Sequence, residues 1–458
     1  MRRAMVVRLA CGYGPSDQWG GTGLAFDARV LILAAHDARI GPLAAGLDAL
    51  GWTTVTARDV GSAEATLQDL PLEAAVIDFD SLTPDAAVRL RAAAQPRRLP
   101  IMVVGAAPDS VEGADVAMSV PPHPAQAALR LEQLGRAAIA EEEFHLRVAT
   151  FGLRGISLAA DPGAAAPLRI LAAGVADRRF LALSNALTSA GAEVVAAPTP
   201  YTAFDYLHET LFDAAILWGA KDHTPALSIA AGMKRNTRLY HIPLMLYLRG
   251  ADEISLNELF NRGFADVAST ETPEQETAER VLAMAGAHRR HLTIRKALDS
   301  VRSLDLMDAS TGLFTPELFA AHLGRVAEAS RVRKRPLSVC VLRVRETEPV
   351  TWARQGGWLD RAMPQIGAMV SRLVRVEDTP ARLAKEVFAL ALPATRGEAA
   401  RLAAERIAAV IGCTAFDAGP DRSPFVAEFD VGAAEMRPGE SAGALLERAS
   451  ADLFDKVR

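Results

Sequence analysis

The sequence carries one pattern twice, and this repeat restricts the possible folds more than any other feature. Between residues 27 and 150, and again between 166 and 300, short apolar runs alternate with stretches of helical periodicity. The phrase Gly-Phe-Ala-Asp-Val at 263–267 echoes Gly-Ala-Asp-Val-Ala at 113–117 in the first copy. Such alternation is typical of a parallel sheet covered by helices on both faces. We therefore predict two α/β domains, joined by the Ala/Pro/Gly-rich segment 159–167.

The length of the chain leaves room for a third domain. At roughly 150 residues per domain, 458 residues suggest about three domains. A long helical pattern at 273–306 follows the second copy as a stalk, and we expect the third domain at 305–458. Residues 1–26 are expected to form a flexible leader, to which we assign no function.

Composition and charge exclude several classes of protein. The formal net charge is -5 and no helix-turn-helix stands out, so we expect no nucleic-acid partner. The three cysteines (Cys11, Cys340 and Cys413) lie far apart, which excludes a disulfide framework and a zinc site. No run approaches the roughly 18 to 20 apolar residues that span a bilayer. We expect a cytoplasmic protein with no metal and no membrane insertion.

Each repeated unit resembles the flavodoxin-like receiver domain of response regulators. The resemblance implies acidic Mg²⁺ ligands after the first strand, a phosphorylatable Asp after the third, a hydroxyl after the fourth and a Lys after the fifth. In the first copy Asp78 matches the acceptor, but Gly105 and Val120 occupy the hydroxyl and lysine positions. Asp78 is a possible vestigial phosphoacceptor, and we favour its interpretation as a leftover surface carboxylate.

The second copy retains less of the receiver chemistry. Trp218 occupies the acceptor position, and Leu248 and Thr270 occupy the hydroxyl and lysine positions. Because an indole ring cannot accept a phosphoryl group, we interpret this unit as a packing or dimerisation module.

Segment 305–458 resembles a GGDEF domain, the nucleotidyl-cyclase-like α/β fold of diguanylate cyclases. The order receiver, receiver, GGDEF is similar to that of PleD-type proteins. The motifs that carry the resemblance follow the order and spacing of the family; they are Asp308–Leu313, Arg375–Asp378, Arg382–Leu390, Ala404–Ile407 and Gly439–Ser441, followed by Arg448 and Ala449.

The residues that a diguanylate cyclase needs are largely missing from this segment. The family's metal-binding Asp positions fall at Arg343 and Arg345, where cations reverse the field that Mg²⁺ requires. The guanine-reading positions fall at Thr351 and Trp352. The resemblance therefore implies a domain that has lost cyclase activity.

The signature turn of the family is also altered. It reads Ala-Lys-Glu-Val-Phe at 384–388, and side chains at its first two positions block the close approach that glycines give to phosphates. Glu386 alone remains of the family's metal ligands. We interpret it as a solvated turn carboxylate rather than a catalytic group.

One site of the family is intact. Arg375 and Asp378 form an Arg-x-x-Asp motif, and Arg406 follows 31 residues after Arg375; these positions match the family's inhibitory c-di-GMP site. A guanidinium donates bidentately to guanine O6 and N7, and a carboxylate accepts from guanine N–H groups. We predict that Arg375, Asp378 and Arg406 bind c-di-GMP as a regulatory ligand, with no catalytic residue.

These observations favour a catalytically inactive c-di-GMP effector. By resemblance it would be a homodimeric adaptor at the cell pole that recruits protein partners, delivering a cell-cycle regulator to an AAA+ protease through a further adaptor. The alternatives are a ligand-independent scaffold or dimerisation protein, a response regulator phosphorylated at Asp78, and a diguanylate cyclase with unusual metal ligands.

Overall fold

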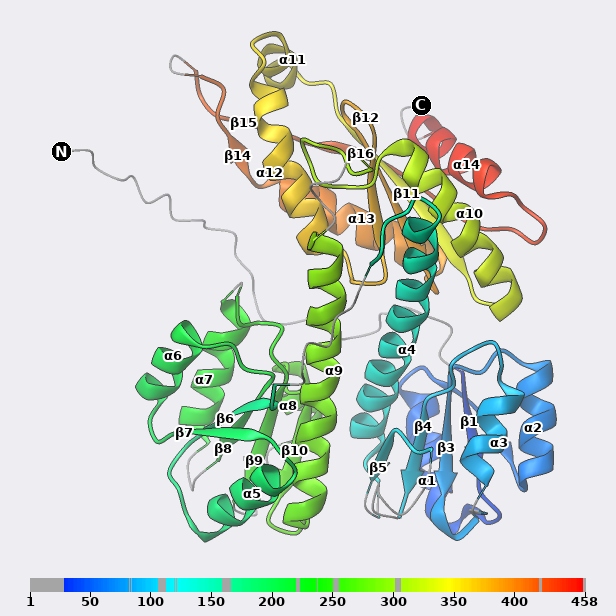
Figure 1. Ribbon diagram of the computed structural model, residues 1–458, viewed down its shortest axis with the longest axis vertical. Coiled ribbons are helices and arrows are strands. Elements are labelled where there is room, and N and C mark those ends of the chain that lie inside the picture. Colours follow the sequence, from blue (N-terminus) through cyan, green and yellow to red (C-terminus); the bar gives the residue numbers. More distant parts are fainter. Residues whose placement is uncertain are drawn as a thin grey trace.

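The computed structural model describes three α/β units (Figure 1). Two five-stranded sheets belong to the first and second α/β domains, and a four-stranded sheet with a separate two-stranded ribbon belongs to the third domain. The described residues are 29–81, 83, 85–105, 113–118, 120, 122–158, 166–219, 223–236, 238–249, 255–300, 306–419 and 422–455.

The first α/β domain is a doubly wound parallel sheet with the strand order β2-β1-β3-β4-β5, which is the flavodoxin-like order. The central strands are buried along nearly their whole length because helices cover both faces, which explains their continuous apolar runs. The predicted parallel sheet is confirmed. Its elements are β1 (Arg29–Leu33), α1 (Asp37–Ala49), β2 (Thr53–Ala57), α2 (Val60–Asp69), β3 (Ala74–Asp78), η1 (Phe79–Ser81), α3 (Ala86–Ala93), β4 (Ile101–Val104), β5 (Val116–Met118) and α4 (Pro124–Gly152).

The second α/β domain repeats this plan, with all of its strands parallel in the order β10-β9-β8-β6-β7. Read from β7, this is the same order as in the first domain, so the internal repeat of the sequence corresponds to a repeated fold. Its elements are β6 (Arg169–Ala173), α5 (Arg178–Ser189), β7 (Glu193–Ala197), α6 (Pro200–Glu209), β8 (Ala214–Trp218), α7 (Thr224–Arg235), β9 (Leu244–Leu248), α8 (Leu256–Asn261), β10 (Asp266–Ser269) and α9 (Glu274–Ser300).

The third domain is built on an antiparallel sheet with the order β12-β13-β11-β16. Its two apolar clusters lie on opposite faces of β11, whose residues Val339 and Cys340 belong to different clusters. Its elements are α10 (Pro316–Arg333), β11 (Leu337–Val344), α11 (Glu348–Gln355), α12 (Trp358–Leu373), β12 (Thr379–Ala384), β13 (Val387–Pro393), α13 (Gly397–Gly412), β14 (Ala415–Phe416), β15 (Phe425–Val426), β16 (Phe429–Glu435) and α14 (Ala442–Asp455).

The long helix α4 belongs to two domains at once. At about 1.5 Å per residue, its 29 residues span about 43 Å. Ala127 and Leu131, near its start, lie in the core of the first domain. Phe151, near its end, lies fully buried in the core of the third domain, with its ring edge-on to Phe314 at a centroid distance of 5.7 Å. The helix therefore links these two domains through apolar packing at both ends.

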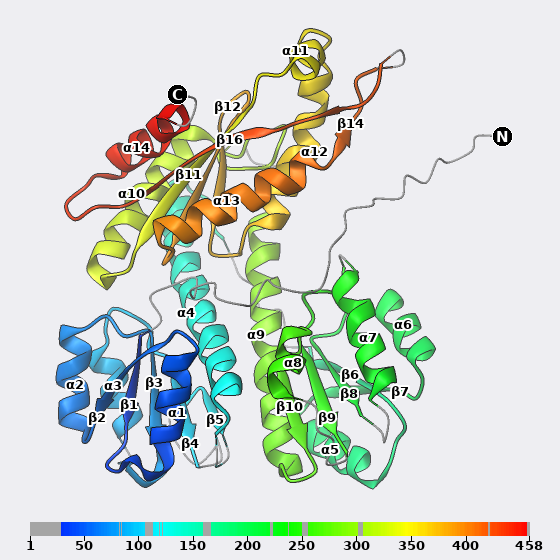
Figure 2. The ribbon, with the colours of Figure 1, turned by 180° about the vertical axis from the view of Figure 1, so that it is seen from behind.

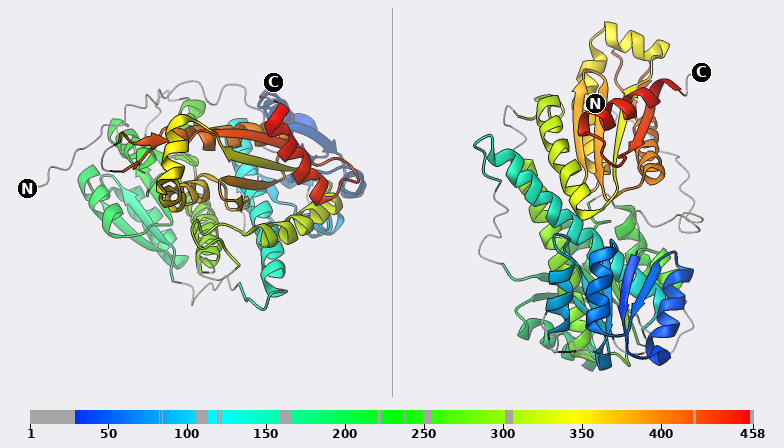
Figure 3. Two further views of the ribbon diagram at one scale, coloured as in Figure 1. Left: turned by 90° about the horizontal axis from the view of Figure 1, so that it is seen from above. Right: turned by 90° about the vertical axis from the view of Figure 1, so that its right-hand side faces the viewer.

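The helices α4 and α9 run side by side from the two α/β domains towards the third domain (Figures 1 and 2). In the side view, the third domain lies at one end of the molecule and both α/β domains lie at the other (Figure 3, right). No helix in the described part of the chain is long and apolar enough to cross a membrane.

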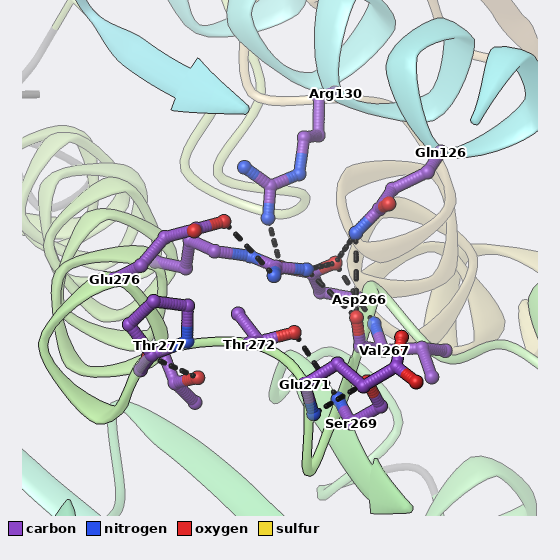
Figure 4. A network of polar contacts seen from close by, with 11 residues as sticks. Gln126, Arg130, Asp266, Val267, Ser269, Glu271, Thr272, Glu276 and Thr277 are labelled. Atoms are coloured by element: carbon purple, nitrogen blue, oxygen red, sulfur yellow. Dashed lines mark hydrogen bonds and ion pairs between the residues drawn. The ribbon is translucent and has the colours of Figure 1, made fainter. Parts of the chain in front are cut away.

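A buried ion cluster joins the two α/β domains (Figure 4). Asp266, at the start of β10, is fully buried. Arg280 of α9 donates hydrogen bonds to both of its carboxylate oxygens, from Nε to Oδ2 at 2.9 Å and from Nη2 to Oδ1 at 2.5 Å. Arg130 and Gln126 of α4 donate to the same carboxylate. Arg130 lies six residues after the first residue of α4, and Arg280 six residues after the first residue of α9. Equivalent positions of the repeat therefore converge on one aspartate.

Candidate ligand-binding site

The predicted Arg-x-x-Asp motif forms a turn between α12 and β12. The Asp378 carboxylate folds back on it, so that Oδ2 accepts a hydrogen bond from the Arg375 backbone N–H at 2.9 Å. Asp378 is only 6% exposed, whereas Arg375 is half-buried. The second carboxylate oxygen, Oδ1, makes no hydrogen bond to any residue that the structure describes. Arg375 and Asp378 are thus brought together, but the acid is withdrawn from solvent.

The turn holds two adjacent buried carboxyl groups. Burial, together with the neighbouring Glu377, raises the pKa of Asp378 to about 7, while Arg375 opposes the shift. Burial also raises the pKa of Glu377. Because the two groups titrate together, the pair keeps one proton at pH values at which an ordinary carboxyl group is already ionised.

Helix α4 of the first α/β domain is hydrogen-bonded to this turn through Arg147. Arg147 donates from Nη1 to the carbonyl of Val376 at 2.9 Å. From Nη2 it donates to the carbonyl of Asp378 and to the hydroxyl of Thr379, each at 3.0 Å. Arg147 is 2% exposed, so these bonds are shielded from water. We call the contacts of Arg147 with Val376, Asp378 and Thr379 the Arg147 clamp.

Glu143 connects the clamp to α10. Its Oε1 accepts from Arg147 Nε at 3.2 Å and from the Thr379 hydroxyl at 3.2 Å, and it lies 2.6 Å from His322 Nε2. Burial alone would raise the pKa of Glu143, but His322 and Arg147 together lower it. A buried ionic network of this kind is costly to break at one partner, because the remaining charge is left uncompensated.

Apolar packing closes the same turn from a second side. Val376 is buried in a small cluster with Ala140 and Phe144 of α4 and Ile294 of α9. Both long helices therefore cover the Arg-x-x-Asp turn, although they come from different α/β domains.

The sequence analysis missed Glu143, Arg147 and His322. Ala140, Arg147 and Phe151 fall on one face of α4, spaced by whole helical turns, and Ala140 and Phe151 are buried. A charged residue on such a stripe is the signal that could have pointed to Arg147. Its partners in the third domain, Val376, Asp378 and Thr379, could not be identified because they lie more than 200 residues away in the chain.

Arg406, the third predicted ligand residue, lies on α13 and is exposed. Its side chain makes no hydrogen bond or ion pair with any described residue, so it does not join the network around Asp378. Helices α12 and α13 pack against each other, and Arg375 lies in the turn that follows α12.

The turn between β12 and β13 carries Glu386, and this carboxylate is fully engaged. Arg354 of α11 donates bidentately to it, with both nitrogen–oxygen distances at 2.8 Å. The Glu386 side chain is mostly buried. Its interpretation as a solvated turn carboxylate was therefore wrong. Glu386 is mostly buried and is paired to Arg354, which lies on a different element and is not revealed by the sequence around the turn.

Arg343 and Arg345 lie at the end of β11 beside the same turn. Arg343 pairs with Asp430 at 3.2 Å, and Arg345 pairs with Asp430 and Glu428, both at 2.9 Å. Asp430 and Glu428, near the end of β11, are thus ion-paired to arginines. Among the described residues, no cluster of three or more His, Cys, Asp or Glu side chains is placed to hold a metal ion.

The model of the family described as "Diguanylate cyclase, GGDEF domain" matches residues 305–456. This segment is a GGDEF domain. It covers the third domain and, with it, the Arg-x-x-Asp turn. No protein among the curated proteins matches the chain.

Solved structures similar to this chain include the GGDEF domain of DgcB from Caulobacter crescentus in complex with c-di-GMP, at 20% identity. The match covers 33% of this chain and 88% of that one, with a TM-score of 0.31. The GGDEF domain of FimX from Pseudomonas aeruginosa is similar at 18% identity over 33% of this chain and 93% of its own, with a TM-score of 0.30. The diguanylate cyclase SiaD from the same organism, in complex with its activator SiaC, is similar at 23% identity over 40% and 70%, with a TM-score of 0.32.

Other altered positions of the GGDEF domain are occupied by aromatic and ionic contacts. The Arg422 guanidinium lies over the Trp352 ring, 3.4 Å from its centroid. Lys385, in the turn itself, pairs with Asp360 of α12 at 3.1 Å. Trp352 lies at a position that the family resemblance assigns to guanine reading, and Lys385 at one that it assigns to phosphate approach.

Asp78, the possible vestigial phosphoacceptor, ends β3 and is 4% exposed. Its interpretation as a surface carboxylate was therefore wrong. Arg39 of α1 lies 3.6 Å from its Oδ1 and also pairs with Asp80. A Cβ on Gly105 would lie 3.2 Å from the Arg39 guanidinium, so the glycine leaves room for this cation. An arginine thus stands beside the carboxylate where a receiver site would hold Mg²⁺.

Trp218 ends β8, at the position in the second domain that corresponds to Asp78. It is buried in the core, with ring centroids 4.1 Å from Tyr247 and 5.6 Å from Phe180. The residue at this position therefore contributes packing.

Proposed function

We propose that this protein is a catalytically inactive, c-di-GMP-binding effector similar to PopA, with two degenerate receiver domains (about 27–150 and 166–300) before its GGDEF domain. Arg375 and Asp378 would bind guanine, with Arg406 as a further ligand residue. The observation that carries the proposal is the contrast between two turns of one domain: the Arg-x-x-Asp turn keeps both ligand residues, while the signature turn has its remaining acid paired to Arg354.

The chemistry of the retained turn supports a guanine ligand. The half-buried Arg375 guanidinium can donate to O6 and N7 of guanine, and the Asp378 oxygen that makes no hydrogen bond to a described residue is an acceptor for guanine N–H groups. The exposed Arg406 guanidinium has no partner among the described residues, and it can bind a phosphate or stack on a purine.

Calorimetric titration of the full chain with c-di-GMP tests the proposal. We expect saturable binding to the wild type and a loss of at least about tenfold in affinity for Arg375→Ala, because one bidentate guanine contact is worth about 1–3 kcal/mol. Arg372→Ala is the matched control, since Arg372 is an exposed arginine on the last turn of α12. A folded wild type that gives no binding would rule out the effector.

The absence of cyclase activity is tested separately. We expect no c-di-GMP from GTP with Mg²⁺ or Mn²⁺, because Arg343 and Arg345 place cations where the family's metal ligands belong and Asp430 is already paired to both. Metal-dependent turnover of GTP would revive the cyclase alternative.

Phosphorylation at Asp78 is not part of the proposal. Arg39 neutralises this carboxylate in place of an acidic metal site, so we expect no mass increase from acetyl phosphate and Mg²⁺. A phosphate adduct that Asp78→Asn abolishes would favour a response regulator instead.

The role of an adaptor follows only from the resemblance. It would comprise homodimerisation, recruitment of a further adaptor and a cell-cycle regulator, and delivery to an AAA+ protease at the cell pole. The second candidate, a ligand-independent scaffold, is favoured by the burial of Asp378 beneath α4. Partner capture that is the same with and without c-di-GMP would support it.

A further inference from the structure

We infer that the Arg147 clamp and c-di-GMP compete for the Arg-x-x-Asp turn, so that ligand binding loosens the contact between α4 and the GGDEF domain. The inference rests on the proposed function and assigns its regulation. It concerns a contact between two domains whose contacting residues, Arg147 and the turn at Val376 and Asp378, lie more than 200 positions apart in the chain.

The first step of the argument is the state of the acid. Asp378 must present its carboxylate to a guanine edge, yet it is 6% exposed and its Oδ1 makes no hydrogen bond to a described residue. A ligand base that reaches Oδ1 therefore requires the turn to move outward from its present position.

The second step is what prevents that movement. Arg147 holds the main-chain carbonyls on both sides of Glu377, at Val376 and Asp378, by charge-assisted hydrogen bonds of 2.9 and 3.0 Å. Main-chain bonds fix the path of the turn itself, and a rotamer change of Asp378 alone cannot release it.

The third step is that the clamp is tied to the position of α4. Arg147 and Glu143 are buried, and Glu143 is shared with His322 and Thr379 of the GGDEF domain. The cluster of Val376 with Ala140, Phe144 and Ile294 shields the turn further. Opening the turn therefore requires a displacement of α4 from this surface, and α4 carries the first α/β domain.

The energetic consequence is mutual exclusion. A ligand that binds only the open turn has its apparent affinity reduced by the fraction of open molecules, and any change that weakens the clamp raises that affinity. By reciprocity, bound ligand must weaken the clamp by the same factor.

The test uses the full chain with the variant Arg147→Lys, which keeps the charge beside Glu143 but loses the planar fork that binds two carbonyls. Arg154→Lys is the matched control, because Arg154 follows α4 and its guanidinium bonds only to the Thr150 carbonyl among described residues. We expect c-di-GMP to bind Arg147→Lys at least about fivefold more tightly than the wild type and Arg154→Lys equally well, since one charge-assisted bond lost from the closed state has that effect.

Amide hydrogen exchange of the wild type provides a second readout that does not depend on a variant. Saturating c-di-GMP should speed exchange in residues 139–151 of α4. Unchanged or weaker affinity of Arg147→Lys would overturn the inference, and so would slower exchange in α4, because α4 would then be part of the bound state.

The two levels of the proposal fail differently. Binding that is equal in the wild type and Arg147→Lys, with unchanged exchange, leaves the proposed function intact and removes the competition. Absence of binding in both folded proteins removes the proposed function. Binding that survives in Arg147→Lys combined with Arg375→Ala places the ligand elsewhere and removes both.

Discussion

Arg147 donates a hydrogen bond to the carbonyl of Asp378 at 3.0 Å, although the two residues lie 231 positions apart. This contact joins the last turns of a helix that begins in the first α/β domain to the Arg-x-x-Asp turn of the GGDEF domain. The proposed ligand site is therefore part of the interface between the first α/β domain and the GGDEF domain, and it does not lie on an open surface.

The anchoring of α4 predicts a large loss of stability for Phe151→Ala. Phe151 is fully buried and packs edge-on against Phe314, so the truncation leaves a cavity and should lower the free energy of unfolding by about 3–5 kcal/mol. Urea denaturation measures it. Leu153→Ala is the control, because Leu153 is 75% exposed two residues later and should change stability little. Equal effects of the two variants would contradict the role of α4 in this core.

The buried cluster around Asp266 predicts a similar loss for Asp266→Asn. The amide removes the carboxylate charge that the buried Arg130 and Arg280 share, and of the described acids only Glu276, 3.5 Å from Arg280, remains to offset them, which should cost about 3–5 kcal/mol. Chemical denaturation of the full chain gives the value. Asp205→Asn, on the exposed face of α6, is the matched substitution and should behave as wild type.

The buried acid of the Arg-x-x-Asp turn predicts that the GGDEF domain becomes less stable as the pH rises from about 4 to about 7. Between its unfolded pKa near 4 and its folded pKa of about 7, Asp378 holds a proton that the unfolded chain has lost. Its contribution to stability is therefore complete below pH 4 and falls by on the order of 1 kcal/mol per pH unit up to about pH 7.

Asp378→Asn should remove this slope, so the difference in unfolding free energy between variant and wild type should change steadily from pH 4.5 to 7. Asp360→Asn, which alters an exposed partner of Lys385, should give a difference that stays constant with pH. A constant difference for Asp378→Asn would mean that the carboxyl is ionised throughout this range.

Two histidines of α9 predict the opposite dependence for the second α/β domain. Burial lowers the pKa of both His288 and His291 to about 4, with His241 adding to the shift at His288 and Arg295 at His291. The unfolded chain takes up protons below about pH 6.5 that the folded domain excludes. Stability is thus complete above pH 6.5 and is lost as pH falls towards 4.

Unfolding measured at several pH values between 4.5 and 7 should show His288→Leu losing less stability with acid than the wild type. His208→Leu, at an exposed site near the end of α6, should retain the wild-type dependence. Parallel curves for the wild type and His288→Leu would show that His288 already carries a proton in the folded domain.

Local sequence determined the parallel sheets and the retained motif. The run Ala-Ala-Val-Ile-Asp at 74–78 is apolar on consecutive positions because both of its faces are covered, and this requirement is visible without the fold. The spacing of Arg375 and Asp378 is likewise local, because the carboxylate bonds to a backbone N–H three residues away. A pattern of this kind can be predicted since every residue that creates it lies within one element or turn.

The partners of the charged side chains were decided only by the tertiary structure. The sequence predicted a solvated acid at Glu386, but α11 places Arg354 beside it. It predicted a surface carboxylate at Asp78, but this residue is buried at the end of β3, with Arg39 3.6 Å away. The covering of Asp378 by Arg147 is the extreme case. Ionic pairing depends on which elements meet in space, and the energy of a buried charge is set by neighbours that are distant in sequence. Only the assembled domains could therefore determine which acidic side chains are buried and paired.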